Sequence, residues 1–202
     1  DVQDPSPPQA ERKRRKPAVR DMDRYPLRRG FRGHAAFAVL SGLSRLLLDM
    51  RAEGVEHIPA EGAFLLCPNH ETYLDGLWVC SFLPPALLGR LCSLAASDLK
   101  NRHGLLGRIM LRMGRSIPVD RFGNPVRALI VAKRQLEKGE IVLLHPEGTR
   151  SATGEFGEFK TGAAYLSVRT GAPILPVYLD GAYVIFNRHR PLPSLRDPDT
   201  RR

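Results

Sequence analysis

The chain has 202 residues, of which 43% are apolar and 26% are charged. These fractions are ordinary for a globular protein and exclude wholesale disorder, and the length suffices for one domain with a sizeable buried core. The formal net charge of +10 indicates an anionic partner or a strongly solvated surface, and the candidate partners are lipid headgroups and nucleic acid.

Residues 1–32 are predicted to form a flexible basic arm. The first ten residues are polar and rich in proline, and a dense group of basic residues follows them. These are Arg12, Lys13, Arg14, Arg15, Lys16, Arg20, Arg24, Arg28, Arg29 and Arg32. Such an arm binds an anionic surface or remains solvated. A basic tail without any partner is the alternative interpretation.

Residues 33–54 are predicted to contain an amphipathic helix that associates with a membrane. The stretch from Phe31 to Met50 carries charged residues, so it lacks the roughly 20 mostly apolar residues of a membrane span. In helical projection Ser41, Arg45 and Asp49 cluster on one side. The opposite face carries Val39, Leu40, Leu43, Leu46, Leu47 and Met50. This pattern is typical of surface-bound membrane proteins, although the apolar face would also suit packing on the domain.

Residues 55–190 are predicted to form a single α/β domain with a largely parallel central sheet flanked by helices, because short apolar runs alternate with helical patterns. The expected strands are Ala63–Cys67, Leu91–Ala96, Ser116–Val119, Ile141–Leu144 and Pro173–Leu179. The expected helices are Thr72–Leu83, Leu105–Met113, one that Asn124 caps and Gly139 closes, and one from Thr161 to about Arg169. Residues 191–202 are predicted to form a polar tail.

Reactive groups in such a sheet gather in the loops at the carboxyl ends of the strands. His70 follows the first expected strand, and Asp75 lies about one helical turn further on. The carboxylate would fix the tautomer of the imidazole and stabilise its charged form, as a general base requires. A lone His-x4-Asp spacing is also typical of a structural hydrogen-bonded pair.

Two later loops carry arginines that suit an anionic ligand. The segment from Gly114 to Arg121 ends a strand with a guanidinium, which binds two phosphate oxygens at once, although Arg121 beside Asp120 would equally suit a structural ion pair. The segment from His145 to Ser151 supplies a carboxylate, a glycine, a hydroxyl and a guanidinium, or is a plain capped loop. Lys160 adds a further cation.

Together these loops resemble the four sequence blocks of the glycerolipid acyltransferases, the group that contains the lysophosphatidic acid acyltransferases. Asn69-His70 with Asp75 is similar to the first block, and Gly114 through Arg121 to the second. The segment from Pro146 to Ser151 is similar to the third, and Leu175-Pro176-Val177 to the fourth. The blocks stand in the family's order between about Val55 and Phe186.

The resemblance implies a function in phospholipid biosynthesis. It implies that His70 is the general base on an acceptor hydroxyl, that Asp75 orients it, and that the hydroxyl attacks an acyl thioester without an acyl-enzyme. The implied substrate-binding residues are Asn69, Arg121, Glu147, Gly148, Thr149, Arg150 and Lys160, and Pro176 is implied to shape the cavity. The donor is expected to be acyl-CoA or an acyl-carrier-protein thioester, with no metal or other cofactor.

The chain departs from the family pattern in two places. His145 stands where the family usually has an aromatic residue, commonly Phe. The hydrophobic segment before the first block is short and charged, whereas many relatives carry clear membrane spans. We therefore expect peripheral attachment to an anionic membrane surface, on its cytoplasmic face.

Other classes of protein fit the sequence less well. A serine hydrolase needs a Gly-x-Ser-x-Gly elbow, which is absent, and a nucleotide-binding enzyme needs a glycine-rich loop, whereas residues 68–74 contain no glycine. Aromatic residues do not alternate with the basic ones as in single-strand binders, so no nucleic acid is expected. A catalytically silent protein that binds anionic lipids remains an alternative. Cys67, Cys80 and Cys92 indicate no disulfide framework and fit a reducing compartment.

Overall fold

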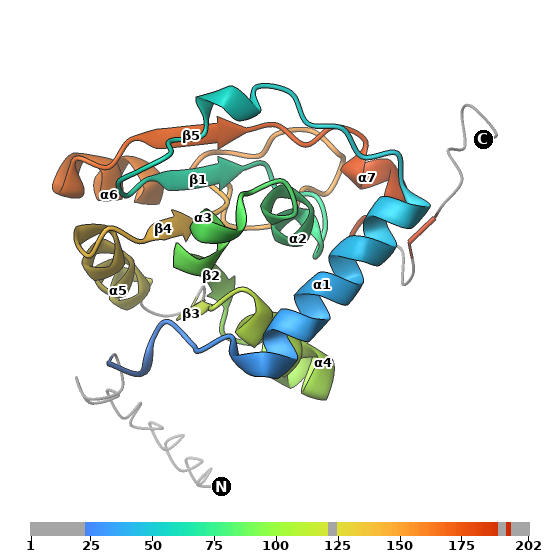
Figure 1. Cartoon of the computed structure of the whole chain (residues 1–202), viewed down its shortest axis with the longest axis horizontal. Coiled ribbons are helices and arrows are strands. Elements are labelled where there is room, and N and C mark those ends of the chain that lie inside the picture. Colours follow the sequence, from blue (N-terminus) through green and yellow to red (C-terminus); the bar gives the residue numbers. More distant parts are fainter. Residues whose placement is uncertain (1–22, 121–124, 190–192, 195–202) are drawn as a thin grey trace, which may run out of the picture.

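The computed structural model describes residues 23–120, 125–189 and 193–194. Its centre is a five-stranded sheet in the order β3-β2-β4-β1-β5, in which all neighbouring strands run parallel (Figure 1). The strands are β1 (Leu65–Pro68), β2 (Leu91–Ala96), β3 (Ile117–Val119), β4 (Ile141–Leu143) and β5 (Ile174–Val177). The expected α/β domain with a parallel sheet is therefore confirmed.

Helices connect the strands, as the parallel arrangement requires. In chain order they are α1 (Gly30–Leu47), the short 3-10 helix η2 (Val55–His57), α2 (Asp75–Cys80), α3 (Pro85–Arg90), α4 (Leu99–Met113), α5 (Val126–Glu137), α6 (Gly162–Thr170) and α7 (Ala182–Ile185). Helix α4 is interrupted at Gly104, where the backbone leaves the helical region. Its second half coincides with the helix expected at Leu105–Met113.

Several helix boundaries differ from those expected. The helix expected at Thr72–Leu83 is the shorter α2, because Asp75 holds the backbone of residues 71 and 72 in a loop. Pro85 begins a further short helix, α3, since proline lacks the N–H that the first helical turn leaves unpaired. Pro125 occupies the N-cap position of α5, and Asn124 lies outside the described residues.

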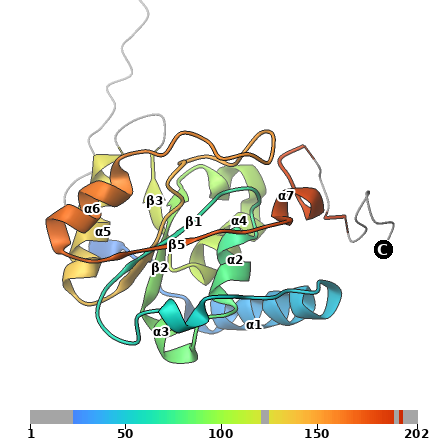
Figure 2. The ribbon, with the colours of Figure 1, turned by 90° about the horizontal axis from the view of Figure 1, so that it is seen from above.

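The helices cover the two faces of the sheet. Helices α5 and α6 bury Ala132 and Leu166 against one face, where Leu65, Cys92 and Val142 point. On the other face α2 and α3 pack on alternate residues of the same strands, such as Leu66 and Leu143. Figure 2 shows this layering from above, with α5 and α6 far from α1. The core therefore lies in two layers, one on each side of the sheet.

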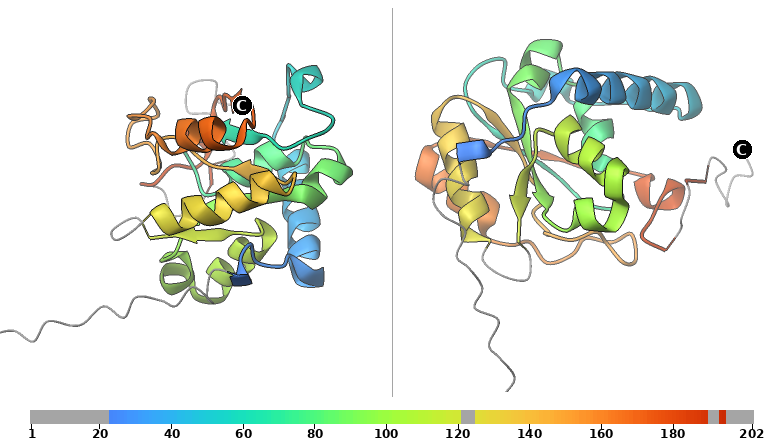
Figure 3. Two further views of the ribbon diagram at one scale, coloured as in Figure 1. Left: turned by 90° about the vertical axis from the view of Figure 1, so that its left-hand side faces the viewer. Right: turned by 90° about the horizontal axis from the view of Figure 1, so that it is seen from below.

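Helix α1 packs against α4 and α2 through small residues (Figure 3, right). Gly33 lies so close to the backbone of Arg112 that a Cβ there would be 3.4 Å from it, and Ser44 Oγ accepts a hydrogen bond from Trp78 Nε1. The buried polar Ser41 belongs to this packed face. Most of the expected apolar face points outward instead: Val39, Leu43, Leu46 and Leu47 are exposed.

The face by which α1 meets the domain carries Phe37 and Leu40 beside these small residues, so it shares Leu40 with the expected apolar stripe but not the exposed residues. Arg29, which the sequence grouped with the basic arm, is buried and donates to the carbonyl oxygens of Met113 and Leu88. Residues 1–22 of the arm lie outside the described residues. Within the described part of the chain, no helix is both long and apolar enough to cross a bilayer.

Candidate active site

The loops that follow β1 and β4 meet at the carboxyl edge of the sheet. The two strands are parallel neighbours, with Leu66 opposite Leu143. The segments that leave the carboxyl ends of the two strands therefore come together. His70 and Asp75 come from the loop after β1, and residues 145–151 come from the loop after β4. The amide of Ser151 donates to the carbonyl of His70 over 2.6 Å, which ties the two loops together.

His70 and Asp75 form a hydrogen-bonded pair, with 2.8 Å between Nδ1 and Oδ2. The Asp75 side chain is fully buried and also accepts hydrogen bonds from the amides of Glu71 and Thr72 and from the Thr72 hydroxyl. Burial alone would raise the pKa of Asp75, but the hydrogen bond and charge of His70 outweigh it and lower the pKa below its usual value. An ionised carboxylate only accepts, so Nδ1 of His70 carries a proton and Nε2 is left as the basic nitrogen.

Glu147 and Asn69 brace the backbone around His70. Glu147 is buried and accepts hydrogen bonds from the amides of His70 (2.9 Å) and Gly157 (3.1 Å), one at each carboxylate oxygen. Asn69 is buried as well and exchanges hydrogen bonds with the backbone of Leu179 while donating to Glu71. Glu147 lines the cavity of the site, whereas Asn69 supports the loop behind His70, and the expected contact of both residues with substrate stays a prediction.

Cationic side chains lie around the mouth of the site. The guanidinium of Arg150 stacks over the ring of Tyr73, 3.7 Å from its centre. Lys160 is exposed and pairs with Glu158 over 2.7 Å. Gly148 and Thr149 are exposed in the turn directly before Arg150, and the φ of +69° at Gly148 suits a residue without a side chain. Arg121 lies outside the described residues, so its expected place here stays a prediction.

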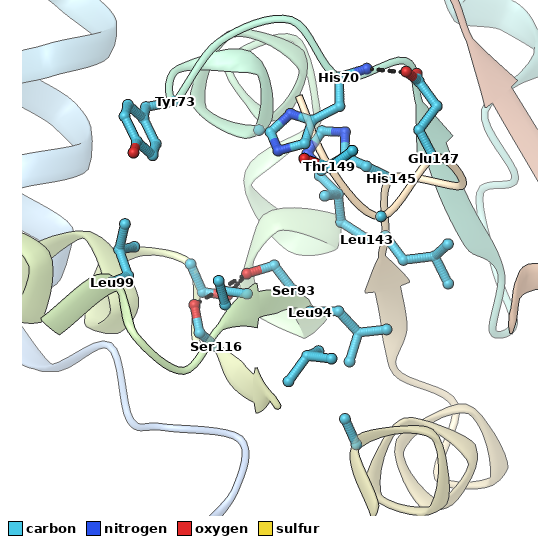
Figure 4. Close-up of a pocket in the computed structure, with 18 of the residues that line it drawn as sticks. His70, Tyr73, Ser93, Leu94, Leu99, Ser116, Leu143, His145, Glu147 and Thr149 are labelled. Atoms are coloured by element: carbon cyan, nitrogen blue, oxygen red, sulfur yellow. Dashed lines mark hydrogen bonds between the residues drawn. The ribbon is translucent and has the colours of Figure 1, made fainter. Parts of the chain in front are cut away.

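The pair opens onto a cavity of about 860 Å³ (Figure 4). Its wall is mainly apolar and includes side chains from both faces of the sheet, because the cavity extends along both sides of β2. Leu94 and Ala128 line it on the face covered by α5, and Cys80 and Leu88 line it on the opposite face. Figure 4 shows His70, His145 and Thr149 gathered at one end and the Ser93–Ser116 pair further along. The site thus joins a basic imidazole to a long apolar space.

Three side chains that could bind a metal lie close together here, but they are not arranged around one common position. The ligand atoms of His70, Asp75 and His145 lie within 4.8 Å of one another. The two imidazole rings, however, are stacked with their centres 3.8 Å apart and 11° between their planes. The lone pairs of ring nitrogens lie in the ring planes. Those of the two histidines therefore lie in two stacked, nearly parallel planes and do not point at one common position. In this arrangement the group does not form a chelating set.

Residues 49–180 match the model of the Acyltransferase family, which is more than half of the chain. The chain belongs to the Acyltransferase family.

Named relatives agree with this membership. The chain is 30% identical over 144 residues to the 1-acyl-sn-glycerol-3-phosphate acyltransferase of Pseudomonas aeruginosa, a match that covers 67% of this chain and 51% of the relative. It is 31% identical over 140 residues to the human 1-acyl-sn-glycerol-3-phosphate acyltransferase alpha, covering 67% of this chain and 47% of the relative. The chain thus spans about half the length of the curated relatives it matches.

A solved structure has the same fold. The crystal structure of the 1-acyl-sn-glycerophosphate (LPA) acyltransferase PlsC of Thermotoga maritima superposes with a TM-score of 0.57 and 26% sequence identity. The superposition covers 85% of this chain and 61% of the other. The resemblance of the four sequence blocks to acyltransferases is therefore confirmed at the level of family and fold.

Two residues beside the site were not predicted from the sequence. Arg188 lies beyond the matched residues but lines the cavity, and it donates to the carbonyl oxygen of Arg150. Glu71 is buried and accepts hydrogen bonds from Asn69 and from the amide of Tyr183. Burial raises the pKa of Glu71 to about 7. No local pattern marks either residue, because the contact of Glu71 with Tyr183 and that of Arg188 with Arg150 join segments that are distant in the chain.

Proposed function

We propose that this chain transfers an acyl group from a thioester to the hydroxyl of lysophosphatidic acid, with His70 as the general base. The observation that carries this proposal is the His70–Asp75 pair, 2.8 Å apart, at the end of an apolar cavity whose mouth is cationic. An acyl chain suits the cavity, the phosphate of the acceptor suits the mouth, and the reacting atoms would meet at Nε2 of His70.

The proposed reaction proceeds in one displacement. Asp75 holds the imidazole with Nε2 unprotonated, and Nε2 accepts the proton of the acceptor hydroxyl. The hydroxyl oxygen forms a bond to the thioester carbonyl carbon, and the tetrahedral intermediate that results expels the thiolate as the carbon–sulfur bond breaks. The proton on His70 then passes to the thiolate, which restores the neutral imidazole. The buried charge of Asp75 favours the imidazolium that exists between these steps.

The proposed substrates follow from the lining of the site. Arg150 and Lys160, with Arg121 from the predicted second block, would bind the phosphate of the acceptor through charge-assisted hydrogen bonds. The thioester is acyl-CoA or an acyl-carrier-protein conjugate, and the reaction requires no metal or redox cofactor. The exposed leucines of α1 and the basic arm would hold the domain at an anionic membrane surface, on its cytoplasmic face, where lipid acceptor and product partition.

The decisive experiment offers the purified protein a panel of lysophospholipids and labelled acyl thioesters, and measures product formation. We expect transfer to lysophosphatidic acid and its loss in His70→Ala, while both proteins sediment with anionic vesicles to the same extent. Unchanged transfer by His70→Ala would rule out the mechanism. Vesicle binding without any transfer by the unsubstituted protein would instead support a silent lipid-binding protein.

A further inference from the structure

His145 touches His70 in two different ways. Its ring lies against the imidazole of His70, with 3.8 Å between ring centres and 11° between the planes. Its Nδ1 lies 3.1 Å from the carbonyl oxygens of both Pro68 and Asn69. These are the two residues that precede His70 in the chain. One side chain therefore contacts both the catalytic ring and the backbone that carries it.

The contacts of Nδ1 fix the tautomer of His145. Carbonyl oxygens only accept hydrogen bonds, so Nδ1 must carry the proton in both contacts. The ring is partly buried beside His70, which lowers the pKa of His145 to about 3. A neutral imidazole with its proton on Nδ1 has a basic Nε2, yet its low pKa prevents it from competing with His70 for a proton near neutral pH.

The register of the sheet explains why these two residues meet. Strands β1 and β4 are parallel neighbours with Leu66 opposite Leu143. Two residues further along each strand, Pro68 is therefore level with His145. The hydrogen bonds to Pro68 and Asn69 continue the connection between the strands beyond the last paired residues, at the point where His70 leaves the sheet.

We propose that His145 is a positioning residue for His70, which it holds by ring stacking and by the hydrogen bonds of Nδ1 to the preceding backbone. Asp75 restrains the His70 ring at its Nδ1 edge, and His145 restrains the ring at its face. The aromatic residue typical of the family at this position can supply the stacking but has no N–H to donate. The chain thus uses an imidazole for two functions where a phenylalanine performs one. This inference rests on the proposed role of His70 in acyl transfer.

Two substitutions separate the two functions. His145→Phe keeps a flat ring and removes the donor, and we expect kcat to fall about fivefold, the effect of one net hydrogen bond. His145→Asn keeps a donor and removes the ring, and we expect a larger fall in kcat, up to about 10²-fold for a misplaced base. In both variants KM should stay near that of the unsubstituted protein, because the proposed phosphate-binding groups are Arg150 and Lys160 and both variants leave them unchanged. Thermal unfolding confirms that each variant is folded.

Nitrogen NMR of labelled histidine tests the geometry without activity. We expect His145 to show a protonated Nδ1 and an unprotonated Nε2, with no titration between about pH 5 and pH 8. We also expect the Nδ1–H signal of His70, which reports its hydrogen bond to Asp75, to move or broaden in both variants, whereas loss of a residue that merely fills space would leave that hydrogen bond in place. A proton on Nε2 of His145 would overturn the proposal. Variants that are folded, retain kcat and leave the Nδ1–H signal of His70 unchanged would overturn it as well. Absence of acyl transfer in the unsubstituted protein would defeat only the proposed function, since the NMR measurement does not depend on it.

Discussion

Asp75 makes more hydrogen bonds than a simple partner of His70 requires. It is fully buried and accepts from His70 Nδ1, from the amides of Glu71 and Thr72, and from the Thr72 hydroxyl, so each of these partners of the carboxylate is a donor. An amide group in its place would turn one oxygen into a donor that faces other donors. The carboxylate therefore shapes the loop and orients the ring of His70 at once.

For this reason Asp75→Asn should impair both catalysis and stability. We expect kcat to fall by about 10²–10⁴-fold, the usual contribution of a positioned acid or base, together with a lower melting temperature. Asp49→Asn, at an exposed carboxylate on the surface, is the matched control and should change neither quantity. An Asp75→Asn protein with near-normal turnover would contradict the assigned role of the pair.

Arg150 should determine how well the acceptor's phosphate is recognised. Its guanidinium is held over Tyr73 at the mouth of the cavity, where it can form charge-assisted hydrogen bonds to an anion. Arg150→Ala should raise KM for lysophosphatidic acid about tenfold or more and leave KM for an uncharged monoacylglycerol unchanged. Equal effects on both acceptors would show that Arg150 acts on the fold and not on the phosphate.

Sequence spacing predicted some of these residues but not their environment. His70 and Asp75 were identified because a strand, a loop and a helix start follow one another within a few residues, and local geometry alone then brings them together. The positions of Glu147 and Asn69 depend on which backbone amides of distant segments face inward, as with Gly157 and Leu179. That information lies in the tertiary fold, so the sequence could indicate their chemistry but not their partners.

At the scale of the elements, prediction succeeded where hydrophobic runs were long and bounded. All five strands are present, and β2 coincides with the range expected. The short helices α3 and α7 were not predicted, since four to six residues carry too little periodicity to detect. For α1 the helix was predicted, but most of its packed face was not: Gly33 permits close approach to α4, and Phe37 packs on the domain together with Leu40 of the expected apolar stripe.

The exposed stripe of α1 predicts where the molecule contacts a membrane. Leu46 is 81% exposed and Leu43 is 47% exposed, although burial of each would be favourable by about 1.5–3 kcal/mol. The double variant Leu43→Glu, Leu46→Glu should sediment much less with anionic vesicles while its melting temperature stays unchanged. Val168→Glu is the matched control, because Val168 is 84% exposed on α6, far from α1 (Figure 1). Equal vesicle binding by all three proteins would place the membrane contact elsewhere.

For the whole molecule, two groups near the loop that carries His70 change the stability in opposite directions as the pH changes. His145, beside His70, Asp75 and the carbonyls of Pro68 and Asn69, has a pKa of about 3 instead of 6.5. Between these values the unfolded chain binds a proton that the folded chain does not, so stability is lost as the pH falls. Glu71, near Asp75, Asp180 and Glu147, has a pKa of about 7 instead of 4.5. The stability that Glu71 contributes is therefore lost as the pH rises from 4.5 to about 7.

His145→Phe should therefore make the stability of the protein less sensitive to acid. The variant loses the hydrogen bonds of Nδ1 at every pH, but it no longer resists protonation in acid. Below about pH 6.5 the free energy of unfolding of the unsubstituted protein should fall relative to that of the variant by about 1.4 kcal/mol per pH unit at most. Denaturant unfolding of both proteins at several pH values measures this difference, in which the opposing contribution of Glu71 cancels. A difference that stays constant from pH 8 to about pH 5 would mean that His145 takes up a proton in the folded protein as readily as in the unfolded chain, because only a ring that burial keeps neutral produces the slope.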